Sequence, residues 1–259
     1  MTGRRSEDPA VRSQSPAPGR GLLLVAMVVF PAALLVVREL SVGSTIWNFR
    51  AVDVADLVLL SPLIILIVVA LLYYLLKYEV ALPVLGIFAA FSFVFVFGQA
   101  MHWAANSIDT FALEVNNYGP VLPNDLESLI FFIDERLSHA ILFVAATGLI
   151  STWLVADQLT RFPSPLGERE WVAAVIGILY GGLIAFSVIE ARMVWMVFPM
   201  SLIPLGTWFF FWRRSPLPAR RHVRERQFAM LVAVMSVAAL VLTGAYGIVN
   251  GGFPQPSEL

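Results

Sequence analysis

The sequence predicts an all-α membrane protein, built as a bundle of about seven transmembrane helices. The 259-residue chain is 59% hydrophobic and only 14% charged, whereas soluble domains carry roughly 25% charged residues. The apolar residues are also gathered into runs of about 20, the length that a helix needs to cross a bilayer. These observations predict a multi-pass position in the cell membrane, with the lipid bilayer as a partner and no nucleic acid.

The apolar runs divide the chain into seven predicted spans. We expect these spans at about residues 21–42, 54–76, 81–107, 128–156, 171–191, 193–212 and 228–249, between a disordered tail over 1–20 and a short tail over 250–259. No small-residue cleavage site closes the first run, so we interpret it as a retained anchor. Only Glu190, Ala191 and Arg192 separate the fifth span from the sixth.

The placement of basic residues predicts the orientation, because cytoplasmic loops are enriched in Lys and Arg. On the predicted spans one side collects Arg4, Arg5, Arg12, Arg20, Lys77, Arg161, Arg169 and the arginines from Arg213 to Arg226. The loops on the other side are poor in basic residues and carry Asp and Glu. We therefore expect a cytoplasmic N-terminus, an external C-terminus, and an external loop over 108–127.

Two polar clusters interrupt the apolar spans. They are Gln99, His102 and Asn106 in the third span, and Asp134, Glu135 and His139 in the fourth. The first three follow i, i+3, i+7 spacing and share a helix face. Glu135 and His139 also share a face, whereas Asp134 points about 100° away from Glu135. The predicted orientation brings both clusters to the external leaflet, and ionisable groups at membrane depth usually mark functional sites.

Imidazole and carboxylate groups together form an N/O donor set that suits a divalent metal, with zinc favoured. The predicted roles are metal ligation by His102, His139 and Asp134, catalysis by Glu135 and Glu190, and substrate binding by Gln99 and Asn106. The chain has no cysteine, which excludes a disulfide scaffold, thiolate ligands and a cysteine nucleophile. It also has no HExxH motif, so the pattern alone does not select the metal.

A bundle of about seven helices with a His and carboxylate cluster resembles the alkaline ceramidase and progestin/adiponectin-receptor superfamily of membrane hydrolases. The resemblance implies a zinc site made by a Ser-x3-His step, an Asp and a His-x3-His pair in the last span. The sequence matches this pattern at His102 and at an acidic residue. Gly98 stands where the serine would precede His102, and the span 228–249 has no histidine. The implied activity is hydrolysis of a lipid-like or small-molecule substrate at the outer leaflet.

Two other functions are compatible with the same residues. The polar clusters could relay protons in a proton-coupled carrier or a ligand-binding membrane protein. They could instead join helices by hydrogen bonds in a non-catalytic scaffold subunit. Elsewhere, Gly177 and Gly181 predict a close packing seam on the fifth span, and the basic run over 213–226 sets the orientation or contacts anionic lipid.

Overall fold

The computed structural model describes residues 45–46, 49–55, 58–59, 61–114, 123–160, 170–214 and 226–255. The predicted first span, 21–42, and the predicted tail over 1–20 lie outside these ranges. The described chain is helical apart from a small antiparallel hairpin of β1 (Thr45–Ile46) and β2 (Phe49–Arg50). The predicted all-α class is therefore confirmed, with this hairpin as an addition that the sequence did not indicate.

The helices follow one another along the chain with short connections. They are α2 (Ala51–Ala55), α3 (Ser61–Lys77), α4 (Leu82–Glu114), α5 (Asn124–Phe131), the π-helix η2 (Phe132–Ser138), α6 (His139–Thr160), α7 (Glu170–Glu190), the 3₁₀ turn η3 (Val194–Met196), α8 (Val197–Arg214) and α10 (Gln227–Val249). Because α5, η2 and α6 join without a break, they form one continuous helical rod.

Five helical stretches of the described chain are long and apolar enough to cross a bilayer. They are Leu82–Ile108, Asp125–Thr160, Trp171–Glu190, Val194–Arg214 and Gln227–Val249. These stretches correspond to the last five predicted spans, and the predicted span 54–76 corresponds to the shorter apolar helix α3, of 17 residues. The fold is thus that of a polytopic membrane protein. The total of seven spans and the orientation stay predictions.

Two connections differ from their predicted form or boundaries. The predicted loop over 108–127 is shorter, because α4 continues to Glu114 and α5 begins at Asn124. Asp125 and Glu127 lie in the first turn of α5, where carboxylates complement the helix dipole. The predicted turn between the fifth and sixth spans is confirmed: α7 ends at Glu190, and Arg192 has a left-handed φ of 51°.

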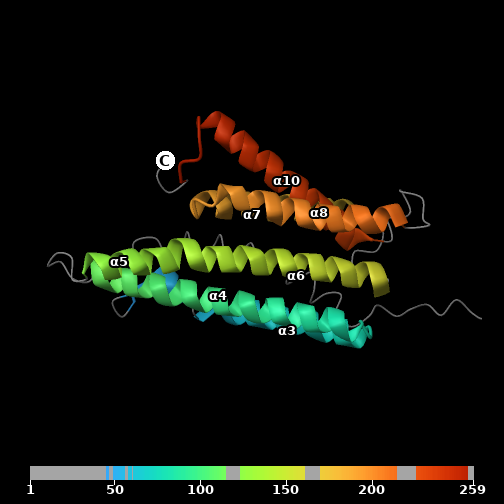
Figure 1. The fold of residues 1–259 in the computed structure, drawn as a ribbon, viewed down its shortest axis with the longest axis horizontal. Helices are drawn as coiled ribbons and strands as arrows, with labels where there is room; N and C mark the ends of the chain where they lie inside the picture. Colours follow the sequence, from blue (N-terminus) through green and yellow to red (C-terminus); the bar gives the residue numbers. More distant parts are fainter. Residues whose placement is uncertain are drawn as a thin grey trace, which may run out of the picture.

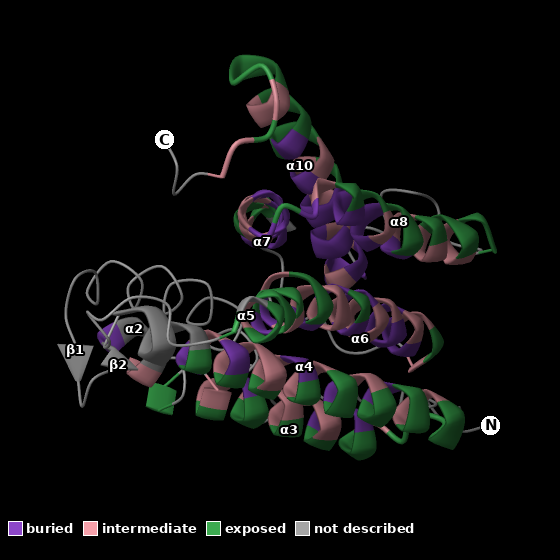
Figure 2. Cartoon of the chain, turned by 60° about the vertical axis from the view of Figure 1, so that its left-hand side comes forward, coloured by how far each residue is buried: buried purple, intermediate pink, exposed green. Residues whose placement is uncertain are grey.

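The rod of α5, η2 and α6 lies between two groups of helices (Figure 1). On one side α3 and α4 pack against α6 through a core that includes Leu75, Phe88 and Trp153. On the other side α7, α8 and α10 share a core with α6 that includes Leu154 and Val232. Figure 2 shows buried residues where α7, α8 and α10 meet, and mostly exposed or half-buried residues on the outer faces of α3 and α4. Exposed apolar side chains on these faces fit contact with lipid.

Glycines set the close helix approaches. A Cβ on Gly177 would lie 2.7 Å from the Leu231 carbonyl oxygen, and one on Gly181 would lie 2.6 Å from that of Met235. Since the contact moves forward along both helices, α7 and α10 run in the same direction. The predicted seam at Gly177 and Gly181 therefore packs directly against α10, as small-xxx-small faces do in membranes.

Candidate functional site

The close approach of α4 and α6 positions the site. A Cβ on Gly98 of α4 would lie 2.9 Å from Cγ2 of Ile141 on α6, and Gly148 of α6 similarly adjoins the ring of Phe91 on α4. The residue numbers rise along one helix as they fall along the other, so the two helices are antiparallel. His102, one turn beyond Gly98, therefore faces the start of α6 and the preceding η2.

His102 and Asp134 are in direct contact. The His102 Nδ1 atom lies 2.7 Å from Asp134 Oδ1, and Asp134 is buried, with 5% of its surface exposed. This distance suits a hydrogen bond, but the angles at the two atoms do not, and Asp134 Oδ1 accepts no hydrogen bond from the described residues. Rotation of the carboxyl group about χ2, which is a soft torsion, would align the two groups without moving the helices.

The π-helix η2 explains why Asp134 takes part. The sequence pattern, read with 3.6 residues per turn, pairs Glu135 with His139 and turns Asp134 away. In a π-helix the hydrogen bonds run from i to i+5, which brings residues five apart, such as Asp134 and His139, onto one side. The Ser138 hydroxyl donates to the Asp134 carbonyl and is fully buried. The wider turn thus directs Asp134 toward α4 and leaves Glu135 half-buried.

His139 supplies a second imidazole beside the pair. Its ring centroid lies 4.7 Å from that of His102, with 57° between the ring planes, and 6.1 Å from that of Phe143. Its Nδ1 lies 3.1 Å from the carbonyl oxygen of Glu135. Because a carbonyl only accepts, Nδ1 is the protonated nitrogen, and in the neutral ring Nε2 is then the basic one.

The remaining predicted site residues surround this centre. Glu135 lies within electrostatic range of His102, Asp134, Glu190 and Arg192, so the end of α7 reaches the site as the sequence predicted. Gln99 and Asn106 lie on either side of His102 along α4, and both are half-buried.

The structure brings the three predicted metal ligands into one region without completing a coordination sphere. Among the residues that the structure describes, no group of three or more His, Asp or Glu side chains is arranged to hold a metal ion. His102 and Asp134 present adjacent atoms, whereas Nδ1 of His139 is turned to a backbone carbonyl. The arrangement is a buried carboxylate with two imidazoles, which is able to bind and pass a proton.

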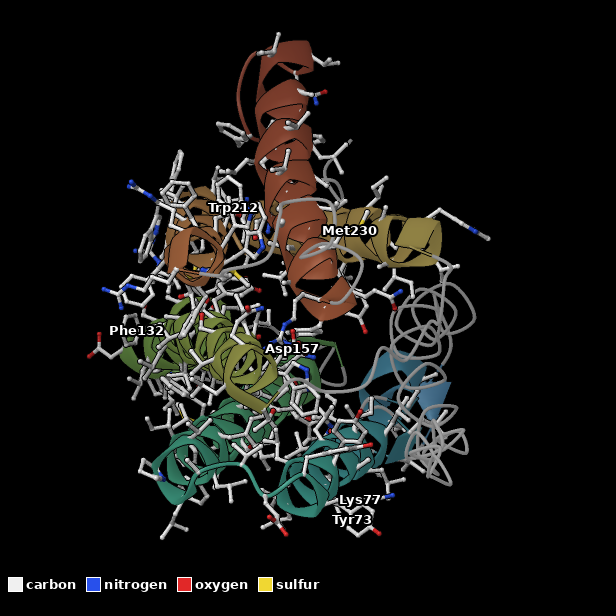
Figure 3. All side chains as sticks on the ribbon, turned by 90° about the vertical axis from the view of Figure 1, so that its right-hand side faces the viewer. Tyr73, Lys77, Phe132, Asp157, Trp212 and Met230 are labelled. Carbon is white, nitrogen blue, oxygen red and sulfur yellow. The ribbon has the colours of Figure 1, made fainter. Side chains whose placement is uncertain are left out.

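A second polar cluster, not predicted from the sequence, lies at the opposite end of α6. Asp157 is buried, and the Arg226 side chain donates to the backbone carbonyls of Asp157 and Gln158. Figure 3 shows Asp157 between the layer of α3 and α4 and the start of α10. Asp157 follows the predicted end of the fourth span by one residue, which hid its burial. No sequence signal linked it to Arg226.

Comparison with known proteins gave no match: no family model, no curated protein and no solved structure is similar to the chain at the threshold applied. Length, hydropathy and helix packing thus characterise it as a polytopic membrane protein with a buried His and carboxylate cluster.

Proposed function

We propose that the protein is a membrane protein that binds and releases a proton at His102, Asp134 and His139, as a proton-coupled carrier or ligand-binding protein. The observation that carries the proposal is the 2.7 Å contact between His102 Nδ1 and Asp134 Oδ1 inside the helix bundle. Histidine is the side chain whose ordinary pKa places its charge change between about pH 5 and 8. A carboxylate beside the ring stabilises the charged imidazolium.

The second imidazole gives the proton a place to go. His139 is close enough for its ring to contact that of His102, and the Glu135 carbonyl fixes the ring with Nε2 as the basic nitrogen. Two rings joined to a carboxylate form a short chain of proton acceptors. The half-buried amides of Gln99 and Asn106, on the same helix face as His102, supply polar groups for a coupled ligand.

Proton binding is testable directly, because the chain has three histidines. Replacing His222 with Gln leaves His102 and His139 as the only ring signals in protein labelled with ¹⁵N-histidine and reconstituted in lipid nanodiscs. The ¹⁵N shifts distinguish the imidazolium from each neutral tautomer. We expect at least one ring to change protonation between about pH 5 and 8, and Asp134→Asn to alter that change.

Rings that keep one neutral tautomer across the whole pH range would contradict the proposal. The matched control is Arg136→Gln, which removes an exposed charge from the same π-helix and should leave both titrations unaltered. If Arg136→Gln alters them as much as Asp134→Asn does, the effect comes from the general field and the specific His102–Asp134 contact is not responsible.

A zinc-dependent membrane hydrolase is the second candidate. It is favoured by one observation: Asp134 Oδ1 is buried, accepts no hydrogen bond from the described residues, and lies beside an imidazole nitrogen. Two donor atoms that face each other outside hydrogen-bond geometry fit ligands of a shared cation. His139 would join through Nε2, since its Nδ1 bonds a carbonyl as metal-bound histidines commonly do. A bound zinc ion supplies a water of lowered pKa.

In this second candidate Glu135 and Glu190 are the carboxylates placed to take a proton from that water, and the substrate is lipid-like or a small molecule. The measurement is the metal content of protein purified without chelators. About one zinc per chain, lost in the His102→Ala/His139→Ala variant, would support the hydrolase. A content near zero that the variant does not change would exclude it.

A further inference from the structure

The last two turns of α8 carry an ordered group of aromatic rings and arginines. The guanidinium carbon of Arg214 lies 3.8 Å from the centroid of the Phe210 ring, and that of Arg213 lies 5.7 Å from the Phe209 ring. Each pair is four residues apart, so each arginine lies above the ring one turn before it. Contacts of this kind hold a guanidinium over a ring face.

Two tryptophans fix the other side of this segment. The rings of Trp208 and Trp212 are stacked, with centroids 5.8 Å apart and 15° between the planes. Trp208 also packs against the core shared by α6, α7, α8 and α10, so the group is attached to the body of the protein. Figure 3 shows Trp212 on the flank of the bundle, beside α8.

The charged and apolar parts of the group face outward together. Phe209 and Phe210 are each 47% exposed, and Arg213 and Arg214 are exposed as well. The apolar stretch Val194–Arg214 ends at these arginines. In a bilayer, the exposed rings of such a helix end lie among the upper acyl chains, and the guanidinium groups lie at the level of the headgroups.

We propose that Arg213 and Arg214 bind the phosphate of an anionic phospholipid, with Phe209 and Phe210 holding the guanidinium groups in position and contacting the acyl chains. Guanidinium is a planar fork that matches phosphate oxygens bidentately. The rings fix its plane before the lipid arrives, which lowers the entropy lost on binding. A phospholipid presents a phosphate directly above an apolar chain, and this sequence of charge and apolar surface matches the group. A free phosphate lacks the apolar half.

The test is lipid retention by the full-length protein, measured by native mass spectrometry from mixed micelles of phosphatidylglycerol and phosphatidylcholine. We expect wild type to retain phosphatidylglycerol preferentially. Arg213→Gln and Arg214→Gln should each reduce this preference by about fivefold, the value of one arginine near an anionic surface. Arg136→Gln, which removes an exposed arginine of η2, is the matched control and should change nothing.

The ring contacts have a separate test. The Phe209→Leu/Phe210→Leu variant keeps both charges and the apolar surface, so a loss of preference in this variant supports positioning by the rings. If this variant retains the wild-type preference, charge alone attracts the lipid and the proposed arrangement is wrong.

Unchanged preference in both arginine variants would overturn the site itself. Displacement of phosphatidylglycerol by inorganic phosphate at equal concentration would show a free phosphate site instead of a lipid site. Thermal unfolding of each variant, compared with wild type, shows that the lipid result does not come from misfolding.

Discussion

His102 and Asp134 form a polar contact inside a bundle whose cores are otherwise apolar. Buried polar partners depend on each other, because removing one leaves the other without compensation. Replacing both by apolar residues of similar volume is often neutral or stabilising. Stability and function therefore give separate information on this contact.

A double-mutant cycle measures this dependence. We expect Asp134→Leu alone to lower the free energy of unfolding by about 3–5 kcal/mol. The double variant His102→Leu/Asp134→Leu should recover most of that loss, since no polar partner is left behind. Thermal or denaturant unfolding in detergent measures both. Strictly additive losses would show that the two side chains do not interact.

At the scale of helices, the Arg226 side chain joins the start of α10 to the end of α6. The carbonyls of Asp157 and Gln158 are among the last four of α6, which have no partner inside the helix. The guanidinium satisfies them and complements the negative end of the helix dipole.

Arg226→Gln should therefore destabilise the fold by about 1–3 kcal/mol, the cost of leaving buried acceptors without a donor. Arg226→Lys keeps the charge but loses the fork that reaches two carbonyls, and it should recover only part of the loss. Unfolding midpoints in one detergent provide the comparison. A variant Arg226→Gln as stable as wild type would show that the two carbonyls gain nothing from the guanidinium.

The seam between α7 and α10 gives a second prediction at this scale. Gly181→Ala places a methyl group 2.6 Å from the Met235 carbonyl oxygen, so the helices must separate, at a cost of about 1–3 kcal/mol. Gly244→Ala on α10 is the matched control, because a Cβ there meets nothing within 4 Å. Equal unfolding free energies for the two variants would contradict the packing of this seam.

These elements show what the sequence could predict. Hydropathy located the five long spans, and residue spacing located the Gly177 and Gly181 seam, because both depend on regular helices. The role of Asp134 could not be predicted, since it depends on the π-helix η2 and no propensity rule marks where one forms. The contact of Arg226 with α6 joins residues 69 positions apart. Only the packing of α10 brings them together.

At the scale of the whole molecule, α6 carries polar clusters near both ends. From His139 to Asp157 it rises about 27 Å, which is close to the thickness of the hydrocarbon layer. His102, Asp134 and His139 lie near one edge, and Asp157 and Arg226 near the other. The sequence predicts that the second edge is cytoplasmic, because Arg213, Arg214 and Lys77 end their helices there.

The absence of cysteine from the chain makes this orientation directly testable. Single variants Ser6→Cys and Ser257→Cys place one thiol in each predicted tail. With seven spans, a membrane-impermeant maleimide added to intact cells should label Ser257→Cys and leave Ser6→Cys unlabelled. Labelling of both tails, or of neither, would indicate an even number of spans.

The central claim is that the imidazoles of His102 and His139, on different helices, face each other. The most direct measurement is a through-space NMR correlation between histidine rings in labelled protein carrying His222→Gln, reconstituted in lipid bilayers. Ring centroids 4.7 Å apart predict a strong cross-peak between the rings, which His139→Asn removes. Two ring signals without any correlation would place the imidazoles apart and contradict the proposed site.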